Sequence, residues 1–64
     1  MLGRKIKKYM DSKGIKQTFL AEKTKMSLQT VNAILNGNRK IEATEYFKIC
    51  QALEISLDYL FSTE

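Results

Sequence analysis

Short apolar stripes with helical spacing, each followed by a turn signal, constrain this chain more than any other feature. Apolar residues recur at intervals of three and four along residues 2–10 and 46–53, as on the inner face of an amphipathic helix. Gly14 and Gly37 each follow a helical pattern, at the position where a helix commonly ends on a residue that tolerates a positive φ angle. Strand signals are missing, because no alternating β-branched run lies between turn residues. The sequence therefore predicts an all-α fold of five short helices.

Tight turns join the predicted helices. Ser27 offers a hydroxyl that can cap the third helix by accepting from a free backbone amide, and Ser56 is expected to cap the last one in the same way. The five helices are expected at residues 3–13, 17–24, 28–35, 43–53 and 57–61. The core is expected to hold Leu2, Ile6, Tyr9, Met10, Ile15, Leu20, Ala21, Val31, Ile34, Leu35, Ile41, Tyr46, Ile49, Cys50, Leu53 and Leu60.

Length and composition indicate one small globular domain over residues 1–64. A chain of 64 residues with 44% hydrophobic residues can bury only a thin core. It has no apolar run of about 18 residues, so no membrane span is expected, and no secretory leader is expected either. A single cysteine, Cys50, excludes an intrachain disulfide, and a reducing, cytoplasmic location is expected.

The residue inventory argues against catalysis. Histidine is absent, so no Ser-His or Cys-His pair can form, and the carboxylates follow no metal-ligand spacing. We therefore expect no enzyme activity, no metal and no cofactor.

The charges are divided unequally along the chain. Residues 1–40 carry a net charge of +8 and residues 41–64 a net charge of −4, within a total of +4. A basic front and an acidic back indicate that one part of the molecule faces a polyanion such as nucleic acid. A solvated surface with a chance asymmetry would give the same numbers.

The second and third predicted helices, joined by a three-residue link, predict a helix-turn-helix. Residues 17–24 (QTFLAEKT) resemble the "Q-x-x-L-A-x-x" scaffold helix of the Xre family, which includes the lambdoid phage repressors and Cro proteins. Residues 27–37 (SLQTVNAILNG) resemble its recognition helix and exit turn, and residues 49–60 (ICQALEISLDYL) resemble its tail. The resemblance covers about residues 2–61. It implies a lambda-repressor-like DNA-binding domain and a transcriptional regulator, typical of prophages, with double-stranded DNA as its partner.

The sequence departs from the family pattern at four positions. Lys16 stands where many members carry a capping threonine or serine. Met10 and Leu35 stand where many members carry a charged pair, and two apolar groups can replace such a pair without loss of stability. Cys50 stands where a small alanine is usual, and we interpret it as a small buried hydrophobe rather than a redox site.

The predicted base-reading residues lie on the outer face of the third helix. The second helix of a helix-turn-helix enters the major groove, N-terminal end first. Gln29 is the first candidate, since glutamine can bond adenine through N6 and N7. By resemblance, Leu28 and Ala33 also occupy base-reading positions, and both can pack against a thymine methyl, although an exposed leucine is also normal on a protein surface. Thr30 and Asn32 are candidates for base or phosphate contacts.

Phosphate contacts are predicted on both sides of the reading helix. Gln17 matches a phosphate-contact position of the family, and Lys16 precedes it at the free amides of a helix N-terminus. The exit from the third helix supplies the second set, which is Asn36, Asn38, Arg39 and Lys40. A solvated loop is the alternative for Arg39 and Lys40. The five basic residues of the first helix are expected to steer DNA at long range rather than to touch it.

A homodimer on an inverted repeat is expected, because one half-site offers too few base pairs for genomic specificity. Leu57, Tyr59 and Phe61 are the candidate dimer surface, unless they simply cover the small core. One rival is a protein-interaction module on the same scaffold, either antitoxin-like or an adaptor, with Phe19 as its best support. The other is a non-specific nucleic-acid coating protein, which the acidic last third disfavours.

Overall fold

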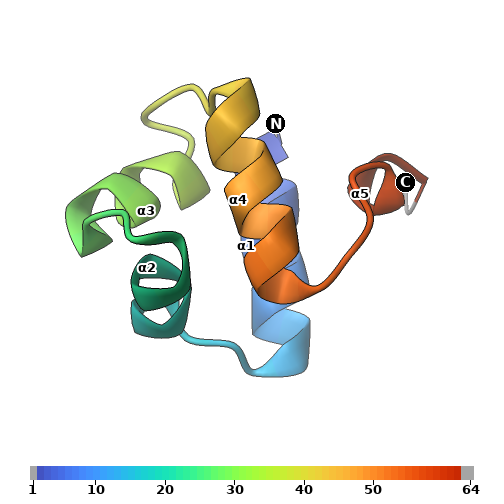
Figure 1. The fold of residues 1–64 in the computed structure, drawn as a ribbon, viewed down its shortest axis with the longest axis horizontal. Coiled ribbons are helices and arrows are strands. Elements are labelled where there is room, and N and C mark those ends of the chain that lie inside the picture. The colour runs from blue at the N-terminus through green and yellow to red at the C-terminus, as the bar shows by residue number, and fades with distance from the viewer. Residues whose placement is uncertain (1, 63–64) are drawn as a thin grey trace.

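The computed structural model describes residues 2–62, which form five helices and no strand (Figure 1). The helices are α1 (Leu2–Lys13), α2 (Gln17–Thr24), α3 (Leu28–Leu35), α4 (Ala43–Leu53) and α5 (Tyr59–Ser62). The prediction of an all-α fold with five helices is confirmed. α2, α3 and α4 begin and end where the sequence predicts, and α1 begins one residue earlier. None of these helices is long and apolar enough to cross a membrane.

Helix packing buries a single apolar cluster. Ile6 and Met10 of α1, Leu20 of α2, Leu35 of α3 and Ile49 of α4 are each at most 1% exposed. α2 packs on both α3 and α4, whereas α1 contacts α3 and, on the side away from α2 and α3, α5 (Figure 1). The core therefore fixes α3 from two directions.

The structure accommodates the departures from the family pattern. Met10 and Leu35 are both buried in the cluster, so an apolar pair stands there without any need for a counter-charge. Cys50 is 1% exposed, and burial raises the pKa of its thiol. Lys16 precedes α2 without any side-chain cap, as its lack of a hydroxyl predicts.

The helix ends use more left-handed residues than the glycines alone predict. Gly14 and Gly37 have φ angles of 70° and 79°, as expected for turn glycines. Lys25 directly follows α2 and has a φ angle of 62°. Glu54 directly follows α4 and has a φ angle of 58°. Side chains in this conformation cost roughly 1–2 kcal/mol each, so packing on either side imposes these two turns.

The last helix differs from the prediction. It begins at Tyr59 and not at Leu57, so Ser56 is not its N-cap. The backbone amide of Phe61 donates to the Asp58 carbonyl at 3.1 Å, and the Leu57 carbonyl accepts from the Tyr46 hydroxyl. Burial, followed by the contact with Cys50, raises the pKa of Tyr46 to about 12, which keeps this hydroxyl protonated as a donor. A tertiary hydrogen bond from α4 therefore holds the segment just before α5.

Candidate nucleic-acid interface

α3 presents an uncharged outer face. Its inner residues Val31, Ile34 and Leu35 are at most 1% exposed, so the register of the helix is fixed by burial. Leu28, Gln29 and Asn32 are exposed, while Thr30 and Ala33 are half-buried beside them. All five predicted base-reading residues therefore lie on one helix. No charged residue occurs in residues 26–38, so this face offers amides, a hydroxyl and methyl groups only.

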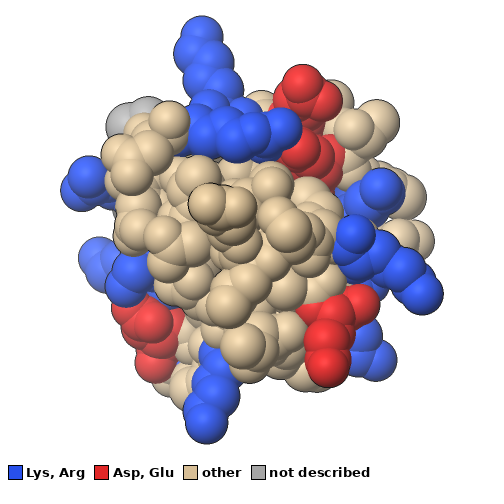
Figure 2. Space-filling model, turned by 90° about the vertical axis from the view of Figure 1, so that its left-hand side faces the viewer, with Lys and Arg blue, Asp and Glu red and all other residues tan. Residues whose placement is uncertain are grey.

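The surroundings of this face are basic. Figure 2 shows the side of the molecule formed by α2 and α3, where the centre is uncharged and Lys and Arg side chains lie around the rim. Only a few Asp and Glu side chains interrupt that rim. An uncharged centre suits base edges and a cationic rim suits phosphates.

A serine cap holds the start of the reading helix. Ser27 Oγ accepts from the Thr30 backbone amide at 3.1 Å and donates to Thr30 Oγ1 at 2.9 Å. The Thr30 hydroxyl therefore keeps one hydrogen that can still be donated, but its position is set by the cap. Leu28 is the first residue of α3 and is 47% exposed, so a large apolar side chain stands at the helix end that leads into a groove.

Three side-chain amides connect the start of α2 to the middle and the end of α3. Asn32 Nδ2 donates to Gln17 Oε1 at 3.1 Å, and Asn36 Nδ2 donates to Asn32 Oδ1 at 2.9 Å. Gln17 is the first residue of α2, where backbone amides lack helical partners. The Gln17 amide nitrogen keeps its own hydrogens free for an anion beside those backbone amides.

The loop after α3 supplies the remaining predicted phosphate contacts. Asn38, Arg39 and Lys40 are exposed. Arg39 Nη1 lies 2.7 Å from Glu45 Oε1, and the same oxygen accepts from the Glu42 backbone amide at 2.9 Å at the start of α4. This bond raises the pKa of Arg39 and lowers the pKa of Glu45. A guanidinium carries five donors, so Arg39 can hold Glu45 and still contact a phosphate.

The predicted site residues thus form a central base-reading set and two groups of phosphate-contact candidates. The base-reading set lies on α3, Lys16 and Gln17 lie at the start of α2, and the four loop candidates follow α3. Sequence reasoning did not find Glu45, which holds Arg39. The signal in the sequence is that Glu45 lies three residues after Glu42, a spacing typical of the start of a helix.

The candidate dimer residues are exposed but also make contacts within the chain. Leu57, Tyr59 and Phe61 are 48%, 39% and 57% exposed. The Tyr59 ring meets the Tyr9 ring edge-on at 5.6 Å, and the Phe61 ring lies 6.1 Å from that of Tyr46. Each aromatic ring therefore packs on a ring of α1 or α4 and remains partly exposed, and the Lys5 ammonium lies 5.8 Å from the centre of the Phe61 ring.

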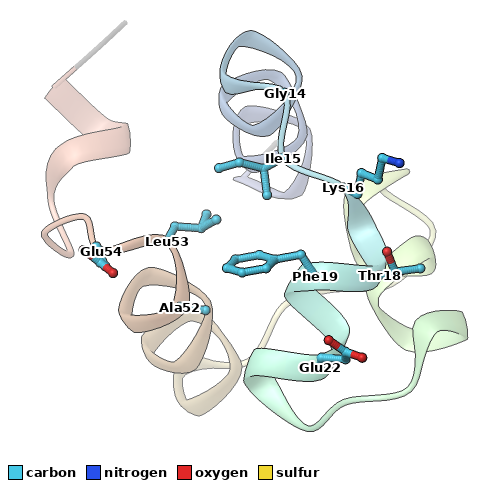
Figure 3. A pocket seen from close by; sticks show the side chains of 9 residues that line it. All are labelled: Gly14, Ile15, Lys16, Thr18, Phe19, Glu22, Ala52, Leu53 and Glu54. Carbon is cyan, nitrogen blue, oxygen red and sulfur yellow. The ribbon is translucent and has the colours of Figure 1, made fainter.

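A second apolar surface lies between the start of α2 and the end of α4. Phe19 is 41% exposed and its ring points toward Ile15 and Leu53 across a groove of 610 Å³ (Figure 3). The Lys23 ammonium lies 5.8 Å from the centre of the Phe19 ring. Phe19 is therefore exposed, although its ring is partly covered.

A helix-turn-helix whose second helix shows an uncharged face between two sets of cationic and amide groups defines a class of DNA-binding proteins. The family model described as "Helix-turn-helix" matches residues 6–60, which run from α1 into α5. The chain belongs to this family, in its Xre type, and is a DNA-binding regulator. Comparison with curated proteins and with solved structures gave no match.

Proposed function

We propose that this regulator binds an inverted-repeat operator as a homodimer and acts as a Cro-like repressor by covering a promoter. The observation that carries the proposal is the uncharged, exposed face of α3 between two groups of phosphate-binding candidates. Such a protein works where the DNA is, so we place it in the cytoplasm, on the nucleoid.

Base readout is assigned to five residues of α3. Gln29 is exposed and belongs to none of the hydrogen bonds among the described side chains, so both ends of its amide are free for adenine. Leu28 and Ala33 pack against thymine methyl groups. Thr30 donates its remaining hydrogen, and Asn32 contacts a base or phosphate next to Gln17.

Phosphate binding is assigned to both ends of the helix-turn-helix. Gln17 and Lys16 hold one phosphate at the start of α2, where free amides favour an anion. The second clamp follows α3 and consists of Asn36, Asn38, Arg39 and Lys40. These contacts fix the position of α3 in the groove but carry no sequence information.

Dimerisation is assigned to the exposed apolar surface of Leu57, Tyr59 and Phe61. Two-fold dimers of helix-turn-helix proteins read half-sites one helical turn apart. A second copy that packs on the exposed surface of these three side chains would remove large apolar groups from water.

Selection of bound duplexes from a random DNA pool by the purified protein tests the proposal, at about 150 mM salt where non-specific binding is weak. We expect enrichment of an inverted repeat with half-sites about 10 base pairs apart. Gln29→Ala should relax one position of each half-site by about 1–3 kcal/mol. Gln51→Ala, at a glutamine on α4 that is also exposed, is the matched control and should leave the motif unchanged. A wild-type pool without an enriched sequence would overturn direct base readout.

The Phe19 groove supports a second candidate function, a protein-docking module of the antitoxin or adaptor type. Its apolar wall of Ile15, Phe19 and Leu53 lies away from the reading face of α3. Under this alternative, Phe19→Ser abolishes partner binding and leaves DNA selection intact, while Gln29→Ala leaves partner binding intact. Under the DNA-reading proposal, only Gln29→Ala changes the selected sequence.

A further inference from the structure

A polar groove lies where α1 meets the end of α3. It has a volume of 390 Å³ and is lined by Arg4, Lys7, Lys8, Asp11, Leu35 and Asn36. The four α1 residues are spaced three and four apart, so they share one face of that helix. From the sequence, the basic residues of α1 are expected to act only at long range, but three of them share this groove with a phosphate-contact candidate.

The groove carries positive charge that its own residues do not neutralise. Lys7 Nζ lies 3.1 Å from Asp11 Oδ2, the one carboxylate of the groove. Neither Arg4 nor Lys8 is paired with a carboxylate among the described residues. Leu35 is fully buried and apolar, so the floor of the groove supplies no counter-charge.

The end of α3 offsets only part of this charge. Arg4 Nη2 donates weakly to the Asn36 carbonyl at 3.5 Å, next to the carbonyl end of α3. A helix C-terminus is equivalent to about half a negative charge. One surplus cation or more therefore remains without a partner, which is a site for an anion.

The groove is continuous with the reading face. Asn36 lines it, and the amide of Asn36 is bonded through Asn32 to Gln17 at the start of α2. A duplex that seats α3 and touches Asn36 therefore brings its sugar–phosphate backbone to the opening of the groove.

We propose that Arg4, Lys7 and Lys8 bind a backbone phosphate of the same duplex, as a third phosphate contact next to Asn36. The inference rests on the proposed function and extends it, because it lengthens the stretch of backbone that each protomer holds. The ligand is a phosphodiester in double-stranded DNA. The contact raises affinity for all sequences equally, since phosphates carry no base identity.

Two double variants with the same loss of charge test the contact. Lys7→Gln/Lys8→Gln removes two charges from the groove. Lys5→Gln/Lys13→Gln removes two charges from the side of α1 where those ammonium groups lie over the Phe61 and Tyr9 rings. Binding of each to the selected operator is measured from 50 to 300 mM salt, with thermal melts to confirm that each variant is folded.

We expect the groove variant to bind about tenfold more weakly, and its slope of log affinity against log salt to fall by about 1–2. The control should lose less than about twofold, since only net charge is changed. Equal losses in the two variants would mean long-range steering and would overturn the contact. A wild-type chain that binds no duplex would overturn the proposed function and this inference together, so the two failures are distinguishable.

A substitution that is expected to increase the affinity for the operator tests the same groove. Asp11→Asn removes the carboxylate that opposes a phosphate, and Glu22→Gln removes one carboxylate on α2 that lines the Phe19 groove instead. We expect Asp11→Asn to tighten operator binding about threefold to fivefold, and Glu22→Gln to change it less than twofold. Equal effects of the two substitutions would overturn the proposal. A further readout is a duplex trimmed by two base pairs at each end, on which the advantage of Asp11→Asn should disappear.

Discussion

The two short helices α3 and α5 both pack on α1, yet the support behind them differs. α3 buries Val31, Ile34 and Leu35 completely and is capped by Ser27. In α5, Leu60 is buried in the core, and the rings of Tyr59 and Phe61 lie against those of Tyr9 and Tyr46. The helix that carries the proposed base-reading residues therefore places three residues in the core, whereas α5, which carries part of the proposed dimer surface, places one there. The four predictions below test this difference, from the largest expected effect to the smallest.

Gly3→Ala should give the largest loss. A Cβ atom at Gly3 would overlap the Ile34 carbonyl oxygen and lie 3.0 Å from the carbonyl carbon, so α1 would have to move away from α3. Alanine improves helix propensity by about 1 kcal/mol, but overlap with backbone outweighs this, and we expect a net loss of about 3 kcal/mol. Urea unfolding measures the loss, and operator binding should weaken with it. Gly14→Ala is the control: no atom lies within 4 Å, so only the left-handed strain of roughly 1–2 kcal/mol remains. Equal stability of Gly3→Ala and the wild type would show that α1 does not seat α3.

Leu60→Ala should cost about 2 kcal/mol, the low end for a buried leucine because the site lies at the edge of the core. We expect the amides of α5 to lose most of their protection from hydrogen exchange while those of α3 keep theirs. The same loss of protection in both helices would show one cooperative unit and remove the contrast drawn between them.

Ser27→Ala should cost about 1 kcal/mol, because the cap of α3 is lost and the Thr30 amide is left without its acceptor. The change in urea midpoint measures it. Ser56→Ala is the control, and since α5 starts at Tyr59 that substitution should be close to neutral. A loss from Ser56→Ala as large as that from Ser27→Ala would restore the cap predicted for the last helix.

The smallest expected effect is the loss, at acid pH, of the folding stability that Glu45 contributes. Arg39 holds the pKa of Glu45 below its ordinary value of 4.5. The folded state therefore gains stability above about pH 4.5 and loses it as the pH falls through the lowered folded-state pKa. Thermal melts between pH 6 and pH 3 should show this fall in the wild type, and Glu45→Gln should flatten it. Glu22→Gln should keep the wild-type slope, and a fall that persists in Glu45→Gln would assign it to other carboxylates.

Much of the helix-turn-helix could be predicted from sequence because its signals are local. Gly14, Ser27 and Gly37 mark turns through their own backbone or hydroxyl chemistry, and the apolar spacing places the inner faces of α2 and α3. The outward positions of the five base-reading candidates follow from the same spacing.

The parts that sequence reasoning missed depend on contacts between distant segments. Tyr46 of α4 binds the Leu57 carbonyl just before α5, eleven residues further along the chain. The left-handed ends at Lys25 and Glu54 have no glycine to mark them. The pairing of Arg39 with Glu45 and the groove between α1 and Asn36 likewise need the packed structure.

The sequence by itself determined that this chain forms five helices, that the second and third are joined by a tight turn, and that α3 carries no charge. Periodicity and capping act within a few residues, so they can be found along the chain. The tertiary structure alone decided how closely α1 approaches α3 at Gly3, which cations gather beside Asn36, and where α5 begins. These depend on the distance between helix axes and on single hydrogen bonds across the core, which no local pattern specifies.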